Sequence, residues 1–163
     1  MTLHTLLTIG LLACGESSQN TQKEVSPQTV AQVESLFMHY EQIRVLLVND
    51  QTDGYTEPLN GLMTNCAEVS AIKQCEEIIK VAKAIQSNGL SDLEKARQSF
   101  GDLSKAMVGI ASDVPAMKSK LRLFTCPMAQ DYPNWIQPTA QLENPYMGQR
   151  MLKCGKAIEW SDL

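Results

Sequence analysis

Two stretches near the carboxyl end of the chain each carry a cysteine and a methionine. In "FTCPMA" these residues are Cys126 and Met128, and in "ENPYMGQRMLKCG" they are Met151 and Cys154. Thiolate and thioether sulfurs are soft donors that suit Cu(I), and Ag(I) by the same softness. A thiol must lose its proton before it coordinates, so metal binding would release protons. The four residues together predict a soft-metal site.

The same cysteines also allow an interpretation without a metal. In an oxidising compartment, Cys126 and Cys154 would form a disulfide that clamps the first stretch onto the second. Met128 and Met151 would then be flexible core residues that fill irregular gaps. The residue types leave both interpretations open.

Histidine usage narrows the chemistry that the chain can support. The only two histidines are His4 and His39, and His4 is lost if the amino-terminal segment is a cleaved signal peptide. One remaining histidine excludes a His-rich zinc site and a two-histidine metalloprotease motif. His39 lies at the flank of an apolar helical stripe, and no Gly-rich phosphate loop occurs. We therefore expect a binding protein and not an enzyme.

Composition and charge bound the fold and exclude one class of partner. The 163 residues are 44% hydrophobic and 20% charged, with a formal net charge of −4, which fits one compact domain. No run of Lys or Arg is present to neutralise phosphates, so nucleic acid is not an expected partner. The few aromatic residues leave aliphatic side chains and eight methionines for the core. This balance favours helices over a β-sandwich.

The amino terminus resembles a bacterial lipoprotein signal, with residues 1–13 as the signal peptide. The apolar stretch "LTIGLLAC" is too short to span a bilayer but has the length of a signal h-region. Cys14 is then the lipidated residue, and residues 14–28 form a polar tether. By resemblance to lipoprotein sorting in diderm bacteria, Gly15 rather than Asp after this cysteine points to the outer membrane, with the domain in the periplasm or, less often, at the cell surface. Either location is oxidising. A buried amino-terminal element with an incidental cysteine is the alternative.

Residues 29–163 are expected to form a single helical domain. Apolar residues recur at spacings of three and four in four segments: 29–48, 56–69, from Ile72 to the "SNG" turn, and 91–110. Ser91 is a suitable N-cap for the last segment, with Glu94 three residues later. Because the connections are short, the predicted fold is all-α, an antiparallel four-helix bundle.

Whether a second cysteine pair, Cys66 and Cys75, can form a disulfide depends on where these helices break. On one straight helix, nine residues at about 1.5 Å each would place the two roughly 13 Å apart, too far for a disulfide. A bend at "AEVSA", with Ser70 as the cap of a new helix, would bring them together. In an oxidising compartment the pair is then predicted to be a disulfide. A second metal pair is the alternative.

The carboxyl-terminal third has a different character. Pro127, Pro133 and Pro138 predict an irregular segment. A short helix is expected after it, with Asn144 as N-cap and Gly155 as the terminating residue. On such a helix the sulfurs of Met147, Met151 and Cys154 would project from one face.

The same third carries a resemblance to a known family. "RQSFGDLSKAM", "FTCPMA", a Trp and "ENPYMGQRMLKCG" resemble a family of uncharacterised bacterial periplasmic domains, over roughly residues 30–157. Met147 departs from the pattern, which usually has an aromatic residue there. The matching positions are Arg97, Phe100, Leu103, Ser104, Cys126, Pro127, Met128, Trp135, Asn144, Pro145, Tyr146, Gly148, Met151, Leu152, Cys154 and Gly155.

Members of that family occur as small lipoproteins and as extensions of copper/silver efflux adaptor proteins of the membrane-fusion type. The resemblance implies a lipid-anchored periplasmic protein that binds Cu(I) or Ag(I) and buffers it or delivers it to heavy-metal efflux components. The alternative is a disulfide-stapled interaction lipoprotein of the envelope with no metal site.

Overall fold

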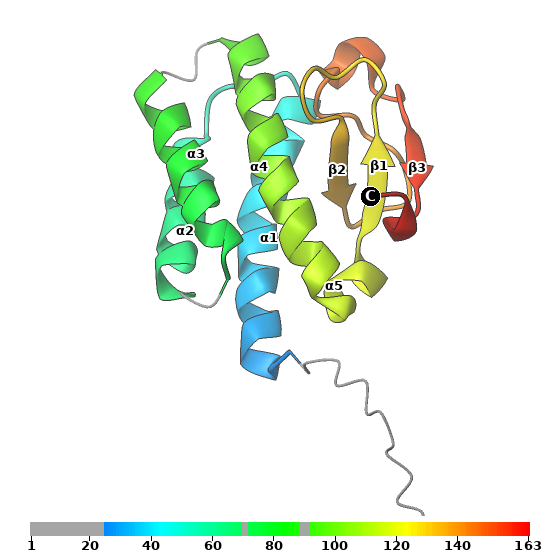
Figure 1. Cartoon of the computed structure of the whole chain (residues 1–163). Coiled ribbons are helices and arrows are strands. Elements are labelled where there is room, and N and C mark those ends of the chain that lie inside the picture. The colour runs from blue at the N-terminus through cyan, green and yellow to red at the C-terminus, as the bar shows by residue number, and fades with distance from the viewer. Residues whose placement is uncertain (1–24, 70–71, 89–91) are drawn as a thin grey trace, which may run out of the picture.

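The computed structural model of the chain describes residues 25–69, 72–88 and 92–163 (Figure 1). The predicted signal peptide, the lipidation site Cys14 and the predicted caps Ser70 and Ser91 lie outside these residues. The described part is mostly helical. Its elements are α1 Pro27–Val48, α2 Thr56–Glu68, α3 Gln74–Asn88, α4 Leu93–Asp113, α5 Pro115–Lys120, β1 Arg122–Thr125, β2 Asn134–Gln137, the 3-10 turn η1 Gly148–Met151, β3 Lys156–Ile158 and the 3-10 turn η2 Trp160–Asp162.

Each of the four predicted helical segments contains a helix. The first begins slightly before the expected boundary at residue 29, because Ser26 caps α1 and its hydroxyl accepts a hydrogen bond from Thr29 N at 3.1 Å. Helix α4 is capped by Asp92, one residue after the expected Ser91. The Asp92 carboxylate accepts hydrogen bonds from the first-turn amides of Glu94 and Lys95, which no other group of the helix could satisfy.

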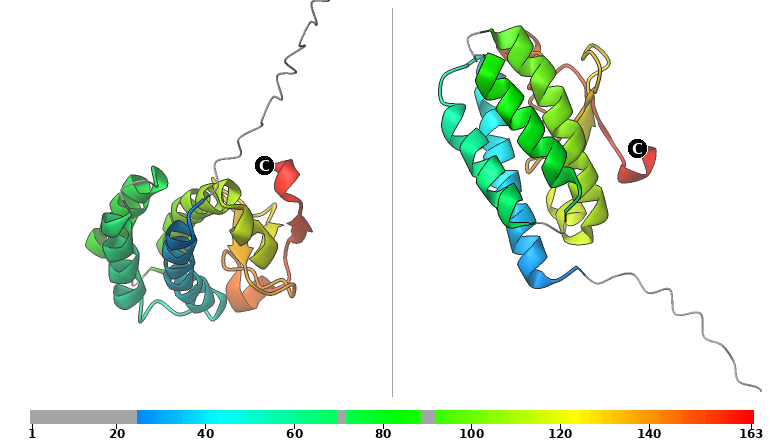
Figure 2. Two further views of the ribbon diagram at one scale, coloured as in Figure 1. Left: turned by 90° about the horizontal axis from the view of Figure 1, so that it is seen from below. Right: turned by 60° about the vertical axis from the view of Figure 1, so that its left-hand side comes forward.

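The helices and the strands form successive layers. Helix α2 packs on α1, α3 packs on α2, and α4 packs on both α3 and α1. Figures 1 and 2 show α2 and α3 on one side of α1 and α4, with the sheet on the other side. Contacts between α4 and β2 join the sheet to the helices.

The sheet makes the all-α prediction wrong. Its three antiparallel strands have the order β2-β1-β3, with Phe124 opposite Trp135 and Thr125 opposite Lys156. The strands are only three or four residues long, and neighbouring residues such as Leu123 and Phe124 are buried together. Alternation of apolar and polar residues, the usual signal of a strand, is therefore absent.

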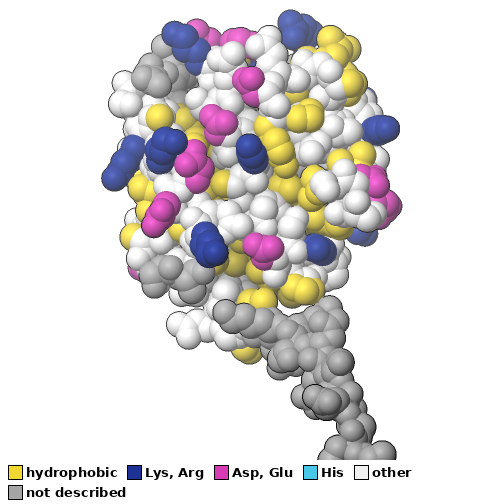
Figure 3. Space-filling view, in the orientation of Figure 1, with side chains coloured by type: hydrophobic (Ala, Val, Ile, Leu, Met, Phe, Trp, Pro, Cys, Tyr) yellow, Lys and Arg dark blue, Asp and Glu magenta, His cyan; other side chains and the backbone are white. Residues whose placement is uncertain are grey.

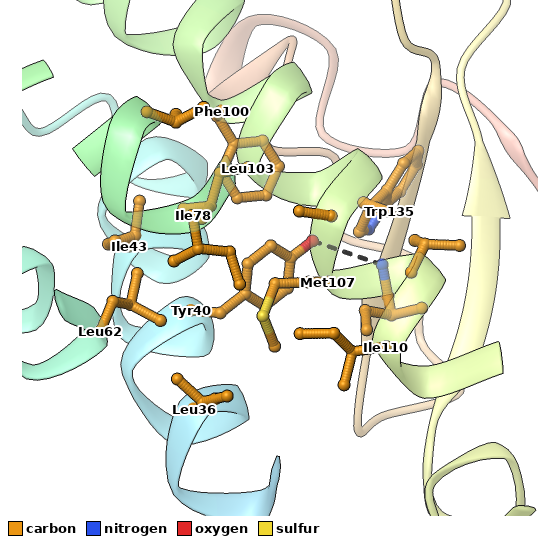
Figure 4. Packing of buried hydrophobic residues seen from close by; sticks show 14 of the residues in the cluster. Leu36, Tyr40, Ile43, Leu62, Ile78, Phe100, Leu103, Met107, Ile110 and Trp135 are labelled. Carbon is orange, nitrogen blue, oxygen red and sulfur yellow. Dashed lines mark hydrogen bonds between the residues drawn. The ribbon is translucent and has the colours of Figure 1, made fainter. Parts of the chain in front are cut away.

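Tyr40 occupies the centre of the core, between the helices and the sheet (Figure 4). Its ring stacks on Phe100 with a centroid distance of 5.2 Å. Its hydroxyl pairs with Ser104 Oγ at 2.8 Å and accepts a hydrogen bond from Ile136 N at 3.4 Å. Burial raises the pKa of Tyr40, so the hydroxyl stays neutral and links α1 and α4 to β2.

The surface carries charges of both signs. On the face drawn in Figure 3, basic and acidic side chains are interspersed with apolar ones.

Within the described residues, no helix has both the length and the apolar character that crossing a membrane requires.

Candidate functional site

The sheet brings Cys126 and Cys154 together. Cys126 directly follows β1, and Cys154 lies two residues before β3. Since Thr125 pairs with Lys156 across these antiparallel strands, the chain just beyond β1 meets the chain just before β3. The two sulfurs are 3.7 Å apart. Both are free thiols in this structure, with Cys126 fully buried and Cys154 half-buried.

Each of these cysteines shares a four-residue turn with a methionine. The first turn is closed by a hydrogen bond from Ala129 N to Cys126 O at 3.1 Å, and it contains Met128. The second is closed by a hydrogen bond from Cys154 N to Met151 O at 2.9 Å. Each cysteine is thus joined to one methionine within its own turn.

The two methionines are not buried with the thiols. Met128 is 55% exposed and Met151 is 40% exposed. Met128 lies instead at a surface depression that Arg97, Tyr146 and Met147 also line. The structure therefore brings together the cysteines of the predicted four-residue site and does not enclose its methionines with them.

The predicted helix after Asn144 is mostly wrong. Asn144 does cap the chain, since its Oδ1 accepts hydrogen bonds from Tyr146 N and Met147 N at 2.8 and 3.1 Å. Only the 3-10 turn η1 follows, because Gly148 adopts a φ of +54° that an α-helix does not allow. Met147 is consequently buried while Met151 is exposed, so the expected common face of sulfurs does not form.

Asn144 also fixes the position of Cys154. Its side chain is fully buried, and its Nδ2 donates a hydrogen bond to Cys154 O. Its backbone N donates to Leu152 O at 2.9 Å. One amide therefore holds the start and the end of the loop 144–154 together, with the Cys154 thiol turned toward Cys126.

Gly155 allows the close approach of this loop to β1. Its φ is +131°, and a Cβ at this position would lie 2.6 Å from Thr125 O. A side chain here is excluded both by the backbone conformation and by the neighbouring strand. Glycine directly after Cys154 is thus a steric requirement of the thiol pair.

We expect Gly155→Ala to lower the free energy of unfolding by about 2–3 kcal/mol, because the left-handed conformation and the contact with β1 both become strained. Urea denaturation under reducing conditions measures this loss. Gly109→Ala is the matched control, since a Cβ on this residue of α4 meets only ordinary contacts and alanine stabilises a helix by about 0.5–1 kcal/mol relative to glycine. Equal effects of the two substitutions would contradict the assignment.

The protonation of Cys154 is coupled to its partner. Partial burial, the hydrogen bond with Cys126 and repulsion from a Cys126 thiolate raise the pKa of the Cys154 thiol. Low thiol pKa values characterise reactive cysteines, and the raised pKa of Cys154 lowers the fraction of this thiol that is present as thiolate at neutral pH. A bound cation would favour the thiolate forms over the protonated ones.

Cys66 and Cys75 meet where α2 ends and α3 begins. Both are buried free thiols. The interaction with Cys75, together with burial, raises the pKa of Cys66. The predicted break between the helices is confirmed, since α2 ends at Glu68 and α3 starts at Gln74. The disulfide itself stays a prediction.

An ion pair between the buried Arg97 and the exposed Asp50 anchors the site loop to the helices. Arg97 donates through Nη2 to Asp50 Oδ1 at 2.5 Å and through Nε to Pro145 O at 3.1 Å. The same Asp50 oxygen accepts a hydrogen bond from Gln149 N at 3.4 Å. Sequence reasoning missed Asp50, although a turn aspartate after a helix is a frequent left-handed position, and its φ is +56°.

The other candidate ligands do not extend the thiol pair. His39 lies on α1, where its Nδ1 is 3.4 Å from Gln42 Oε1. Within residues 25–69, 72–88 and 92–163, no three His, Cys, Asp or Glu side chains gather in a group that could hold a metal ion. Any metal at Cys126 and Cys154 therefore has two such donors from this part of the chain.

Comparisons with known proteins identify no relative. No protein family, no curated protein and no solved structure matches the chain.

Proposed function

We propose that this protein is a lipid-anchored periplasmic domain that binds one Cu(I) or Ag(I) ion between the thiolates of Cys126 and Cys154. The ion is cargo that the protein buffers or hands to a heavy-metal efflux system. The role is binding and not catalysis, with anchoring through Cys14 to the periplasmic side of the outer membrane.

The separation of the two sulfurs carries the proposal. At 3.7 Å it is well beyond the about 2.05 Å of a disulfide. Two sulfurs that share a tetrahedral metal at about 2.3 Å are about 3.8 Å apart, and two thiolates in line across a two-coordinate ion lie farther apart. The two thiols are therefore neighbours that a small movement apart would make ligands of one ion, and the half-buried Cys154 is the thiol that solvent reaches.

Thiolate chemistry selects the class of ion. Two soft donors suit a monovalent soft ion, whereas structural zinc takes four nitrogen or sulfur ligands. The resemblance of the Cys-Pro-Met and Met-Leu-Lys-Cys-Gly segments to domains of copper/silver efflux adaptors is the reason to name Cu(I) and Ag(I). The same resemblance suggests the efflux partner.

Competition for Cu(I) tests the proposal. The chain carrying Cys14→Ser, reduced and kept free of oxygen, is titrated against a chromophoric Cu(I) chelator. We expect one tightly held equivalent, and we expect the variant Cys126→Ser with Cys154→Ser to lose at least about a hundredfold in affinity, because hydroxyl oxygen is a poor ligand for Cu(I). The paired variant Cys66→Ser with Cys75→Ser is the control and keeps the affinity. Unchanged binding without Cys126 and Cys154 would refute the proposal.

A disulfide between Cys126 and Cys154 is the second candidate. The contact between their sulfurs favours it as well, since an oxidant need only bring two touching thiols closer. In this case the domain is a stapled interaction lipoprotein. Intact mass of protein purified without reductant distinguishes the two, because each bridge removes two hydrogens. A bridge that resists mild reduction, combined with no Cu(I) binding by the reduced form, supports the staple.

A further inference from the structure

Two exposed methionines lie in the two turns that hold the thiol pair. The large apolar side chains that are exposed within the described residues include three methionines, and two of these are Met128 and Met151. The third, Met38, is 63% exposed on α1. Single exposed apolar residues are common on protein surfaces. Met128 and Met151 differ from these because each belongs to a turn that holds one of the two cysteines.

Chain geometry keeps both thioethers near the thiols. Met128 lies two residues after Cys126, and Met151 lies three residues before Cys154 in a hydrogen-bonded turn. Such spacings limit the Cα separation within each turn to about 7 Å. Methionine has three rotatable side-chain bonds, so each exposed thioether can adopt several positions around its turn.

The solvent exposure of the four sulfur-bearing residues rises from the cysteines to the methionines. Cys126 is fully buried, Cys154 is half-buried, and both methionines are exposed. The two methionines are therefore more accessible than the two thiols to an ion in solvent. Thioethers carry no proton that must be displaced, whereas both thiols must ionise before they bind.

We propose that Met128 and Met151 form an outer thioether site that captures Cu(I) or Ag(I) from solvent and passes it inward to Cys126 and Cys154. This inference rests on the proposed function of the thiol pair. Transfer is a ligand exchange in which a metal–thioether bond breaks as a metal–thiolate bond forms and the thiol proton leaves to water. No electron is transferred.

The depression beside Met128 carries charged side chains of both signs. It is lined by Arg97, Arg150 and Glu94, and the guanidinium of Arg97 is paired with Asp50. The positive charge of Arg97 is thus balanced by a carboxylate.

Methyl NMR of the methionines tests the outer site. The reduced Cys14→Ser chain, labelled with ¹³C at the methionine methyl groups, is titrated with Ag(I), which does not change oxidation state. We expect the methyl signals of Met128 and Met151 to shift at the first additions, while the signal of Met38 stays in place. The shifts persist in the variant Cys126→Ser with Cys154→Ser, and they disappear when Met128 and Met151 are replaced by leucine.

The outcomes separate this inference from the proposed function. Shifts at Met128 and Met151 no larger than at Met38 would overturn the outer site, even if the thiols bind Cu(I). Persistent methionine shifts, together with Cu(I) affinity that does not depend on Cys126 and Cys154, support an outer thioether site and refute the thiolate site.

Discussion

Replacing Asn144 with alanine is expected to lower the free energy of unfolding by about 3 kcal/mol and to weaken Cu(I) binding about tenfold or more. The fully buried amide satisfies Tyr146 N, Met147 N and Cys154 O. Each of these backbone groups loses its partner in the variant, and an unsatisfied buried group costs about 1–3 kcal/mol. Urea denaturation and chelator competition, both under reducing conditions, measure the two effects.

The binding loss has a physical origin distinct from the loss of stability. Without the hydrogen bond to Cys154 O, the loop 144–154 no longer holds the Cys154 thiol against Cys126, and groups that orient metal ligands typically contribute about 10–100-fold to affinity. Asn144 acts in this way as a positioning residue, since it supplies no ligand atom.

Gln137→Ala is the matched control for this prediction. Gln137 is another fully buried amide, which donates to Thr139 O and Gln141 O and accepts from Trp135 Nε1. Its loss should also destabilise the fold, but its hydrogen bonds do not include the cysteine turns. Equal losses of Cu(I) affinity in the two variants would show that Asn144 acts only through stability.

The helices could be predicted because their signals are local. The spacing of apolar residues such as Val33, Tyr40 and Leu47 marks one face of α1, and these residues are buried as expected. The predicted cap of α4 was less accurate, because its actual cap, Asp92, stands next to Ser91, which also has good capping chemistry. Such neighbours compete on local geometry, which the residue types alone do not specify.

The sheet and the site depended on long-range pairing. The four residues of β1 carry no local signal that places Thr125 opposite Lys156. This register nevertheless brings Cys126 to Cys154. The spacing of soft donors selected Cys126 and Cys154, which meet, but also Met128 and Met151, which are not buried with them. Their exposure was not predictable, because whether Met151 faces solvent depends on the left-handed turn at Gly148, which ends the expected helix early.

A second large effect is expected at the ion pair of Arg97 and Asp50. Arg97→Met should lower the free energy of unfolding by about 3 kcal/mol or more, because it leaves Pro145 O and the Asp50 carboxylate without their buried donor. Asp50→Asn should cost only about 1 kcal/mol. Asparagine tolerates the left-handed backbone at this position, keeps an acceptor for Arg97, and replaces a carboxylate that is 37% exposed and therefore partly solvated.

The double variant decides whether the pair acts as one unit. If Arg97 stabilises the fold chiefly through Asp50, the two losses will be non-additive by about 1–2 kcal/mol in chemical denaturation. Additive losses would mean that Arg97 acts instead through the carbonyl of Pro145. Gly148 favours the first result, because a Cβ on this residue would collide with both the Asp50 carboxylate and the Arg97 guanidinium. Because the loop packs around both charged groups, its stability is expected to depend on the ion pair and not on either residue alone.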